Sequence, residues 1–263
     1  MIRVVLAGAA GKMGREVIKA LDGHPDVALV GAVSPRHAGR DVGEIAGLAH
    51  RGIEIHATLD GALASTSADV LIDLTTPEAV LGNALEALRL GLRPLIGSTG
   101  LGAEDLAQLA DAAGRTGLGV LVAPNFAIGA LLMMRFAQEA ARYFEHAEII
   151  ELHHAQKLDA PSGTALKTAQ AMRESRPSFG RAHPDEVEAL AGARGADIEG
   201  IRVHSVRLPG MLAHQEVIFG GLGQVLTIRH DALSRECYMP GVLLGVRKIM
   251  TLQGLVIGLE HVL

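Results

Sequence analysis

Short apolar runs alternate with helical patterns through the first half of the chain, and this alternation constrains the fold most. The apolar runs are Ile2–Ala7, Val27–Val33, Val70–Leu74, Pro94–Ile96 and Gly119–Val122. The helical patterns are Lys12–Leu21, Pro77–Leu90 and Ala103–Arg115. Runs that are apolar throughout are typical of strands buried on both faces. Strand–helix alternation predicts βαβ units, and therefore an α/β fold with a Rossmann-like doubly wound parallel sheet.

The pattern changes near residue 126. We expect helices over Ile128–Phe144, Pro161–Glu174 and Ser234–Gln253, strands over Glu148–His153, Gly200–Val206, His214–Phe219, Gln224–Arg229 and Gly254–Leu263, and a polar loop or lid over Arg176–Gly195. The glycine-rich turn at 220–223 joins two of these strands as a hairpin. Strands paired by short turns predict a second, α+β domain with a mixed or antiparallel sheet.

Composition excludes several classes of protein. The 263 residues are 49% hydrophobic with a net charge of −5, which favours a globular fold and argues against general nucleic-acid binding. A single cysteine, Cys237, excludes a disulfide framework. No run of about 18 apolar residues is free of charges and turn residues, and no basic segment precedes the first apolar run. We therefore expect a cytoplasmic protein without a membrane span.

A glycine turn follows the first predicted strand and opens a helix. It reads Gly8-Ala9-Ala10-Gly11-Lys12-Met13-Gly14, so alanine stands where the strict dinucleotide fingerprint has its second glycine. Such a turn lets the backbone approach a pyrophosphate at a helix N-terminus. The position favours dinucleotide binding; the alternative is an ordinary strand–helix turn in a fold that binds something else.

Two further turns follow predicted strands at the same edge of the sheet. They are Gly97-Ser98-Thr99-Gly100 and Ala123-Pro124-Asn125-Phe126. Open α/β sheets bind ligands at the carboxyl ends of their strands. Either turn alone is unremarkable, but together with the first they predict one ligand-binding edge.

The segment Glu151–Ala165 carries the most chemistry. His153, His154 and Lys157 end a predicted strand, and Ser162-Gly163-Thr164 opens a helix in which Asp159 or Ala160 is the expected capping residue. Cationic side chains beside free helix N–H groups form a site for a carboxylate or phosphate. Histidine and lysine there also exchange protons.

Two other interpretations of this segment remain open. Adjacent histidines on a strand face opposite ways, which makes joint ligation of one metal awkward, and neither a cysteine nor a third histidine lies nearby. We therefore expect no metal. Lys157 could also be an ordinary solvated lysine, but the crowding of positive groups against the helix start argues otherwise.

The segment resembles the signature of the dihydrodipicolinate reductase family, whose E-x-H-H-x-x-K-x-D-A-P-S-G-T-A pattern is matched from Glu151 to Ala165. The resemblance extends to the first glycine turn, to Gly97–Thr99 (G-S-T where G-T-T is usual), to Ala123–Phe126 with Gly129, and to the closing strands and helix. It covers nearly the whole chain.

The resemblance implies NADH- or NADPH-dependent reduction of a small cyclic dicarboxylate in lysine and diaminopimelate biosynthesis. It implies that His153 and Lys157 are catalytic, and that His154, Ser162, Gly163 and Thr164 bind substrate. The implied cofactor contacts are Gly8, Ala9, Ala10, Gly11, Lys12, Met13, Gly97, Ser98, Thr99, Ala123, Pro124, Asn125 and Phe126. The implied domains are a dinucleotide-binding domain (1–126), a substrate-binding and oligomerisation domain (127–238) that builds a homotetramer, and a C-terminal helix and tail (239–263) returning to the first.

Cofactor choice is where the sequence departs from the family. About 20 residues past the glycine turn, a carboxylate usually binds the adenosine ribose. Ser34 stands there, followed by Arg36, with Arg40 and Lys12 as further cations. A serine does not repel a 2′-phosphate, and arginine pairs with one, which favours NADPH. The alternative is that both cofactors serve about equally.

Two other functions compete with this one. The chain could be another Rossmann reductase of an anionic oxo or imino acid, or a dinucleotide-sensing protein without chemistry. The presence of both His153 and Lys157 argues against a sensor, which needs no proton donor.

Overall fold

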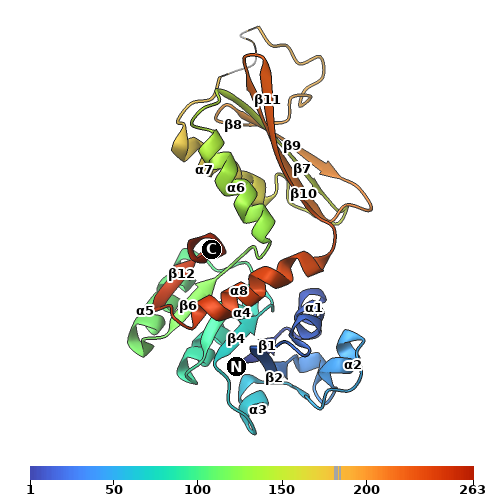
Figure 1. The fold of residues 1–263 in the computed structure, drawn as a ribbon, viewed down its shortest axis with the longest axis vertical. Coiled ribbons are helices and arrows are strands. Elements are labelled where there is room, and N and C mark those ends of the chain that lie inside the picture. Colours follow the sequence, from blue (N-terminus) through green and yellow to red (C-terminus); the bar gives the residue numbers. More distant parts are fainter. Residues whose placement is uncertain (181–182, 184) are drawn as a thin grey trace. The chain divides into compact units, whose positions relative to one another are not determined.

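The computed structural model describes residues 1–180, 183 and 185–263. The chain divides into two compact units (Figure 1). Unit 1 comprises Met1–Ala127 together with Tyr238–Leu263, and unit 2 comprises Ile128–Cys237. Each unit has its own sheet and its own core.

Unit 1 is built on a seven-stranded sheet in the order β12-β6-β5-β4-β1-β2-β3. Its strands are β1 (Ile2–Ala7), β2 (Val27–Val33), β3 (Ile55–His56), β4 (Val70–Asp73), β5 (Arg93–Ile96), β6 (Gly119–Val122) and β12 (Gly254–Ile257). All neighbouring strands run parallel. The predicted Rossmann-like doubly wound sheet is therefore confirmed.

Helices cover the sheet of unit 1. They are α1 (Lys12–Leu21), α2 (Val42–Ala46), α3 (Leu59–Leu63), α4 (Pro77–Arg89), α5 (Ala103–Thr116) and α8 (Met239–Ile249). Side chains of α3, α4 and α5 form apolar clusters with the central strands. On α8, Gly245 lies against Leu95 of β5, and a Cβ there would be only 3.0 Å from the leucine side chain. Burial on both faces explains why these strands are apolar throughout.

The strand order reverses between β1 and β4. From β1 the chain adds β2 and then β3 on one side, and then crosses to add β4, β5 and β6 on the other. Because all strands are parallel, their carboxyl ends meet at one edge of the sheet. Such a switch point is where open α/β sheets bind ligands.

Unit 2 contains a five-stranded mixed sheet in the order β11-β10-β7-β9-β8. Its strands are β7 (His146–His153), β8 (Ala196–Ile198), β9 (Ile201–Arg207), β10 (Ala213–Gly221) and β11 (Gln224–Ala232). Strands β7 and β9 are parallel, and the other pairs are antiparallel. The mixed sheet predicted for the second half of the chain is thus present.

Helices α6 (Ile128–Ala140) and α7 (Gly163–Ser175) pack side by side and share one apolar core with this sheet (Figure 1). On the face beneath them, the cross-strand row of Ile149, Val203 and Val217 is fully apolar and buried. The next row toward the end of β7 contains Glu151 and Gln215, both buried. The core face of the sheet therefore becomes polar just where β7 ends.

Several element boundaries differ from expectation. Helix α6 ends at Ala140 rather than at residue 144, and α7 begins at Gly163 rather than at 161. The hairpin loop is only Leu222-Gly223, because the two preceding glycines belong to β10. The last predicted strand stops at Ile257, where Gly258 with φ 101° turns the chain into a short 3₁₀ helix. Apolar periodicity marks a helix or strand better than it marks its ends.

The predicted loop over Arg176–Gly195 lies partly outside the described residues. Within its described part, Arg194 bridges Glu186 of the loop, at 2.7 Å, and Glu148 of β7. This ion pair connects the end of the loop to the sheet. Across the residues described here, no helix is long and apolar enough to cross a membrane.

Candidate active site

The turn after β1 has the backbone geometry that only glycine readily supplies. Gly8 has φ +81°, and a Cβ on it would lie 2.5 Å from the carbonyl oxygen of Leu74. A Cβ on Gly14 would lie 2.3 Å from the Gly8 oxygen. Both contacts are with backbone atoms, so neither position admits a larger residue without moving β1, β4 or α1.

The start of α1 is open. Gly11 is the N-cap, is exposed and supplies no side-chain cap, and no acidic residue lies in the first turn. The first helical bond runs from Arg15 N–H to the Gly11 carbonyl at 3.1 Å. The N–H groups of Lys12, Met13 and Gly14 therefore have no partner within the helix. An uncapped helix start at a switch point suits a pyrophosphate.

A buried carboxylate organises the neighbouring strand ends. Asp73, at the end of β4, is fully buried and accepts hydrogen bonds from the Ser98 hydroxyl at 2.9 Å and from Thr75 and Asn83. The Ser98 hydroxyl therefore faces the protein, while Thr99 is exposed. A Cβ on Gly97 would lie 2.6 Å from the Phe126 ring, so the turns after β5 and β6 pack against each other.

The loop after β2 presents the cations expected beside a cofactor. Ser34 directly follows β2 in an extended conformation, and its hydroxyl lies 3.1 Å from Nδ1 of His37. Arg36 and Arg40 are exposed, and neither forms an ion pair with any described residue. Both guanidinium groups are available to an anionic ligand.

These turns fit a dinucleotide. The turns after β1, β5 and β6 all lie at one edge of unit 1, as predicted, because their strands are parallel. Ala9 and Phe126 are buried, whereas Ala10, Met13 and Asn125 are partly exposed and Lys12 and Pro124 are exposed. The glycine cradle and the uncapped helix leave backbone N–H groups at this edge for phosphate oxygens.

In unit 2, Glu151 is the centre of the site. It is fully buried, and Arg207 of β9 binds both of its carboxylate oxygens, at 2.8 and 2.9 Å. The Ser162 N–H donates to it at 3.2 Å. Burial alone would raise the pKa of Glu151, but hydrogen bonds from Arg207, Ser205 and His153 outweigh it and hold the pKa below its usual value.

His153 is the last residue of β7, and its imidazole contacts the Glu151 carboxylate. Its Nδ1 lies 2.5 Å from Oε2 of Glu151, and 15% of its side chain is exposed. Burial lowers the pKa of His153 below its usual value, and the charges of Lys157 and Arg207 add to this effect against the opposing pull of Glu151. The imidazole is therefore neutral at physiological pH.

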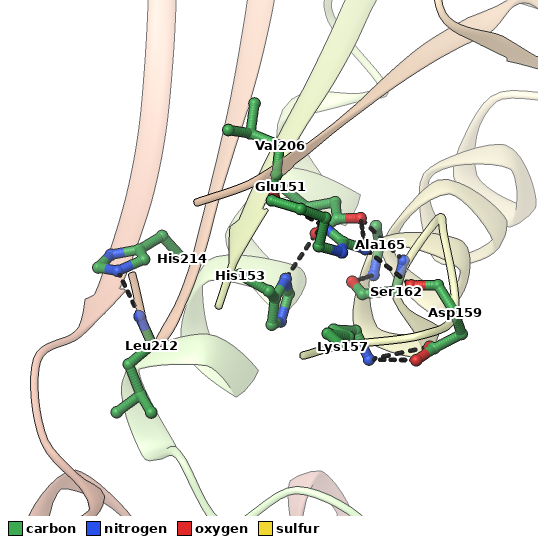
Figure 2. Close-up of polar contacts among 10 residues, drawn as sticks. Glu151, His153, Lys157, Asp159, Ser162, Ala165, Val206, Leu212 and His214 are labelled. Atoms are coloured by element: carbon green, nitrogen blue, oxygen red, sulfur yellow. Dashed lines mark hydrogen bonds and ion pairs between the residues drawn. The ribbon is translucent and has the colours of Figure 1, made fainter. Parts of the chain in front are cut away.

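Lys157 lies in the loop between β7 and α7. Its Nζ donates to both carboxylate oxygens of Asp159, at 2.8 and 2.9 Å (Figure 2). Hydrogen bonding to Lys157 lowers the pKa of Asp159. Lys157 is therefore not simply solvated: 21% of its side chain is exposed, against 62% for Asp159.

Helix α7 begins beside these groups, although not with the expected cap. Ser162, not Asp159 or Ala160, is the N-cap, and its hydroxyl accepts a hydrogen bond from Ala165 N–H at 3.2 Å. The predicted capping position was wrong because the chain becomes helical only after Pro161, at Gly163. The N–H groups of Gly163 and Thr164 precede the first helical bond, which runs from Leu166 to Ser162.

The structure brings most of the expected unit 2 residues together. The side chains of His153 and Lys157 lie beside the start of α7, near the end of β7 (Figure 2). His154 lies just beyond the strand, is partly exposed, and has an Nδ1 without a hydrogen-bond partner among the described residues. No group of three or more potential metal-ligating side chains occurs in the described ranges.

Three charged residues were not assigned a role from the sequence. Glu151 is the first residue of the segment that resembles the family signature, but the sequence around an acidic residue in a strand does not show which residues it will bind. Arg207 lies 56 residues further along, and only strand pairing brings it opposite His153. Asp73 ends a buried strand, and an acid at that position is a usable signal.

The sheet, the glycine turn and the side chains at the end of β7 define a class: two-unit α/β proteins with a Rossmann dinucleotide-binding unit and a second unit in which histidine and lysine side chains lie beside a helix N-terminus. Comparisons with known proteins narrow the class. The family model described as "Dihydrodipicolinate reductase, N-terminus" matches residues 2–126. The model described as "Dihydrodipicolinate reductase, C-terminus" matches residues 129–263.

Individual relatives agree. The chain is 58% identical to 4-hydroxy-tetrahydrodipicolinate reductase of Desulfitobacterium hafniense over 263 residues, which is all of this chain and 98% of that protein. It is 53% identical to the enzyme of the same name from Geobacillus thermodenitrificans, with 100% and 99% covered. The solved structure of dipicolinate-bound dihydrodipicolinate reductase from Paenisporosarcina sp. TG-14 is 45% identical, covers both chains fully and superposes with a TM-score of 0.88.

This chain belongs to the dihydrodipicolinate reductase family, and the predicted resemblance is confirmed. A more distant likeness shows the fold alone: amine dehydrogenase from Mycobacterium smegmatis is 17% identical with a TM-score of 0.68.

Proposed function

We propose that the protein reduces 4-hydroxy-tetrahydrodipicolinate to tetrahydrodipicolinate, with loss of water, using NADPH or NADH. The observation that carries the proposal is the arrangement of His153, Lys157 and the start of α7 in a chain that belongs to this family. The reaction is a step of lysine and diaminopimelate biosynthesis.

Two side chains exchange protons with the substrate in this proposal. A nicotinamide cofactor, when bound, supplies hydride to the conjugated substrate ring. The negative charge that develops on the ring then needs a proton donor. Lys157 is a cation with three N–H donors, and it exchanges its bond to the exposed Asp159 for one to the substrate. His153 presents a neutral imidazole that takes or relays a proton.

The start of α7 binds a carboxylate. Gly163 is exposed, and nothing lies within 4 Å of where its Cβ would be, so a ligand can approach its N–H. Thr164 offers the next N–H, and the positive end of the helix dipole favours an anion there. In this proposal His154, whose Nδ1 has no hydrogen-bond partner among the described residues, contacts the same anion. Ser162 is 2% exposed and caps the helix, so it acts by fixing these N–H groups in place.

The open start of α1 binds the cofactor pyrophosphate in this proposal. Gly8 and Gly11 allow the approach, and the turns at 97–99 and 123–126 complete the edge. Ser34, Arg36 and Arg40 bear on the adenosine ribose, where the absence of a carboxylate and the two free guanidinium groups favour NADPH.

A spectrophotometric assay tests the proposal. The expected result is oxidation of NADPH or NADH that depends on the fresh product of dihydrodipicolinate synthase, with tetrahydrodipicolinate as the product by mass spectrometry. Oxidation driven by other oxo or imino acids, but not by this substrate, would identify a different reductase. Cofactor binding without any turnover would identify a sensor.

We also propose a homotetramer built through the sheet of unit 2. Ile150 and Leu152 of β7 point away from the helix-covered face and are partly exposed, and Val225 of β11 is 70% exposed. Light scattering after size exclusion tests this: a mass near 110 kDa, about four times the 27.5 kDa chain, is expected, and a monomer contradicts it. Residence in the cytoplasm remains a prediction, tested by cell fractionation.

A further inference from the structure

Glu151 is unusual because it is a charged side chain in the core face of a sheet. Its side chain is completely buried, and the cross-strand row next to it is entirely apolar. Burying a carboxylate is costly unless it is paired and hydrogen-bonded. A buried charge at this position therefore requires an explanation beyond core packing.

Arg207 neutralises the charge of this carboxylate and also binds the loop between β7 and α7, which carries Lys157. Its guanidinium binds both Glu151 oxygens, and it donates to the carbonyl oxygen of Asp159 at 2.7 Å. Asp159 in turn binds the Lys157 ammonium. One arginine thus connects the anion beneath His153 with the loop that carries Lys157.

The protonation of Glu151 determines which nitrogen of His153 carries hydrogen. A carboxylate held ionised by a bidentate arginine only accepts hydrogen bonds. The His153 nitrogen 2.5 Å away, Nδ1, must therefore carry the proton. In the neutral ring, Nε2 is then the nitrogen with a free lone pair.

We propose that Glu151 and Arg207 are a positioning pair that holds His153 in the Nδ1–H tautomer and leaves Nε2 to exchange protons with the substrate. The inference rests on the proposed function for the role of His153, but not for its tautomer. Neither Glu151 nor Arg207 needs to touch the substrate.

The charged groups of the described residues that act on His153 come from its own strand, the following loop and β9. Glu151 lies on the same strand, and Lys157 and Asp159 lie in the following loop. Arg207 approaches from β9, while β10 places the uncharged Ala213 opposite His153. Glu151 is thus the charge that favours imidazolium at contact distance, while Lys157 and Arg207 oppose it.

Long-range ¹H–¹⁵N NMR of the histidine rings tests the tautomer in the wild-type protein without substrate. The chain has 12 histidines, so the His153 signals are assigned by their loss in His153→Gln. We expect a protonated Nδ1 and an unprotonated Nε2 at neutral pH. The opposite tautomer overturns the proposal, whether or not the protein reduces the proposed substrate.

Glu151→Gln tests the pair by titration and kinetics. Without the anion, the pKa of His153 should fall further, because the cations Lys157 and Arg207 remain. The kcat should drop by up to about 10⁴-fold, the loss typical when an amide replaces the carboxylate behind a catalytic histidine, with a much smaller change in KM. An unchanged His153 pKa and kcat overturn the proposal.

Gln215→Met is the matched control. Gln215 pairs with Glu151 across the strands, is also buried, and donates to the Thr168 hydroxyl of α7 at 2.8 Å, while Ala213 is the residue of β10 that pairs with His153. It should lower the melting temperature but leave the His153 pKa and tautomer unchanged. If it shifts them as Glu151→Gln does, general loosening of the core explains both variants and the pair has no specific role. If Glu151→Gln fails to fold, Arg207→Lys and the wild-type tautomer decide.

Discussion

Helices α1 and α7 both begin at a proposed ligand site in the segment that follows a strand, yet their N-termini are built differently. The start of α1 has a glycine N-cap, no side-chain capping hydrogen bond and no acidic residue in its first turn. The start of α7 has a serine cap, and its N-cap N–H binds the buried Glu151. One site consists of bare backbone, and the other is held by a network of charges.

The difference follows from what each site has to do. A pyrophosphate needs N–H groups and room, and unit 1 supplies them with a tight glycine turn in which Gly8 packs against the Leu74 backbone and leaves no space for a side chain. A substrate that must be protonated needs donors at fixed positions, so unit 2 surrounds His153 and Lys157 with partners. Substitutions in the glycine turn of unit 1 should therefore change the backbone geometry, whereas substitutions of His153 and Lys157 in unit 2 should change the rate of the chemical step.

The largest effect is expected from the chemical groups of unit 2. Lys157→Ala and His153→Ala should each lower kcat by about 10²–10⁴-fold, the usual contribution of a positioned acid or base. Steady-state kinetics with saturating cofactor measures this. A variant with nearly wild-type kcat removes that residue from proton transfer.

The second effect compares two glycines. Gly8→Ala should lower the free energy of unfolding by about 2–4 kcal/mol, because it combines a positive φ with a Cβ 2.5 Å from a backbone oxygen. Gly163→Ala meets nothing within 4 Å and should change it by less than about 0.5 kcal/mol. Urea unfolding followed by circular dichroism measures both. Equal losses would contradict the contrast between the two turns.

This contrast also shows what the sequence could predict. The glycine turn is a local pattern, so its strand, turn and helix were located within a residue or two. The pairing of Glu151 with Arg207 depends on the register of β7 and β9, which no local pattern reveals. The short elements β3 and β8, of two and three residues, carry too few side chains for any periodicity.

The third effect concerns the anion site of unit 2. Pyridine-2,6-dicarboxylate should inhibit more strongly than pyridine-2-carboxylate, because each charge-assisted hydrogen bond contributes about 1.5–3 kcal/mol. That range corresponds to roughly 10- to 150-fold in the inhibition constant. Competition assays against substrate measure the two constants, and equal inhibition would contradict a site for two carboxylates.

The smallest effect concerns cofactor choice in unit 1. Wild type should have a higher kcat/KM for NADPH than for NADH at low salt, with a ratio that narrows as salt screens the 2′-phosphate. Ser34→Glu should move the ratio toward NADH by about tenfold, or 1.4 kcal/mol, whereas the uncharged control Ser34→Gln should move it less. A wild type that favours NADH severalfold, with a ratio that Ser34→Glu leaves alone, shows that this loop does not select the cofactor.

We assign cofactor binding to the start of α1 and proton transfer to Lys157 of unit 2. This division is tested most directly by titrating NADPH without substrate into Gly11→Val and Lys157→Ala. Gly11 has φ −70°, which valine adopts, and its Cβ would lie 3.2 Å from the Gly8 oxygen, a tight contact that a shift of a few tenths of an ångström relieves, so the fold should tolerate the change. Calorimetry should show much weaker NADPH binding for Gly11→Val and an unchanged dissociation constant for Lys157→Ala. Unimpaired binding by Gly11→Val, or an equal loss in both variants, would contradict this division.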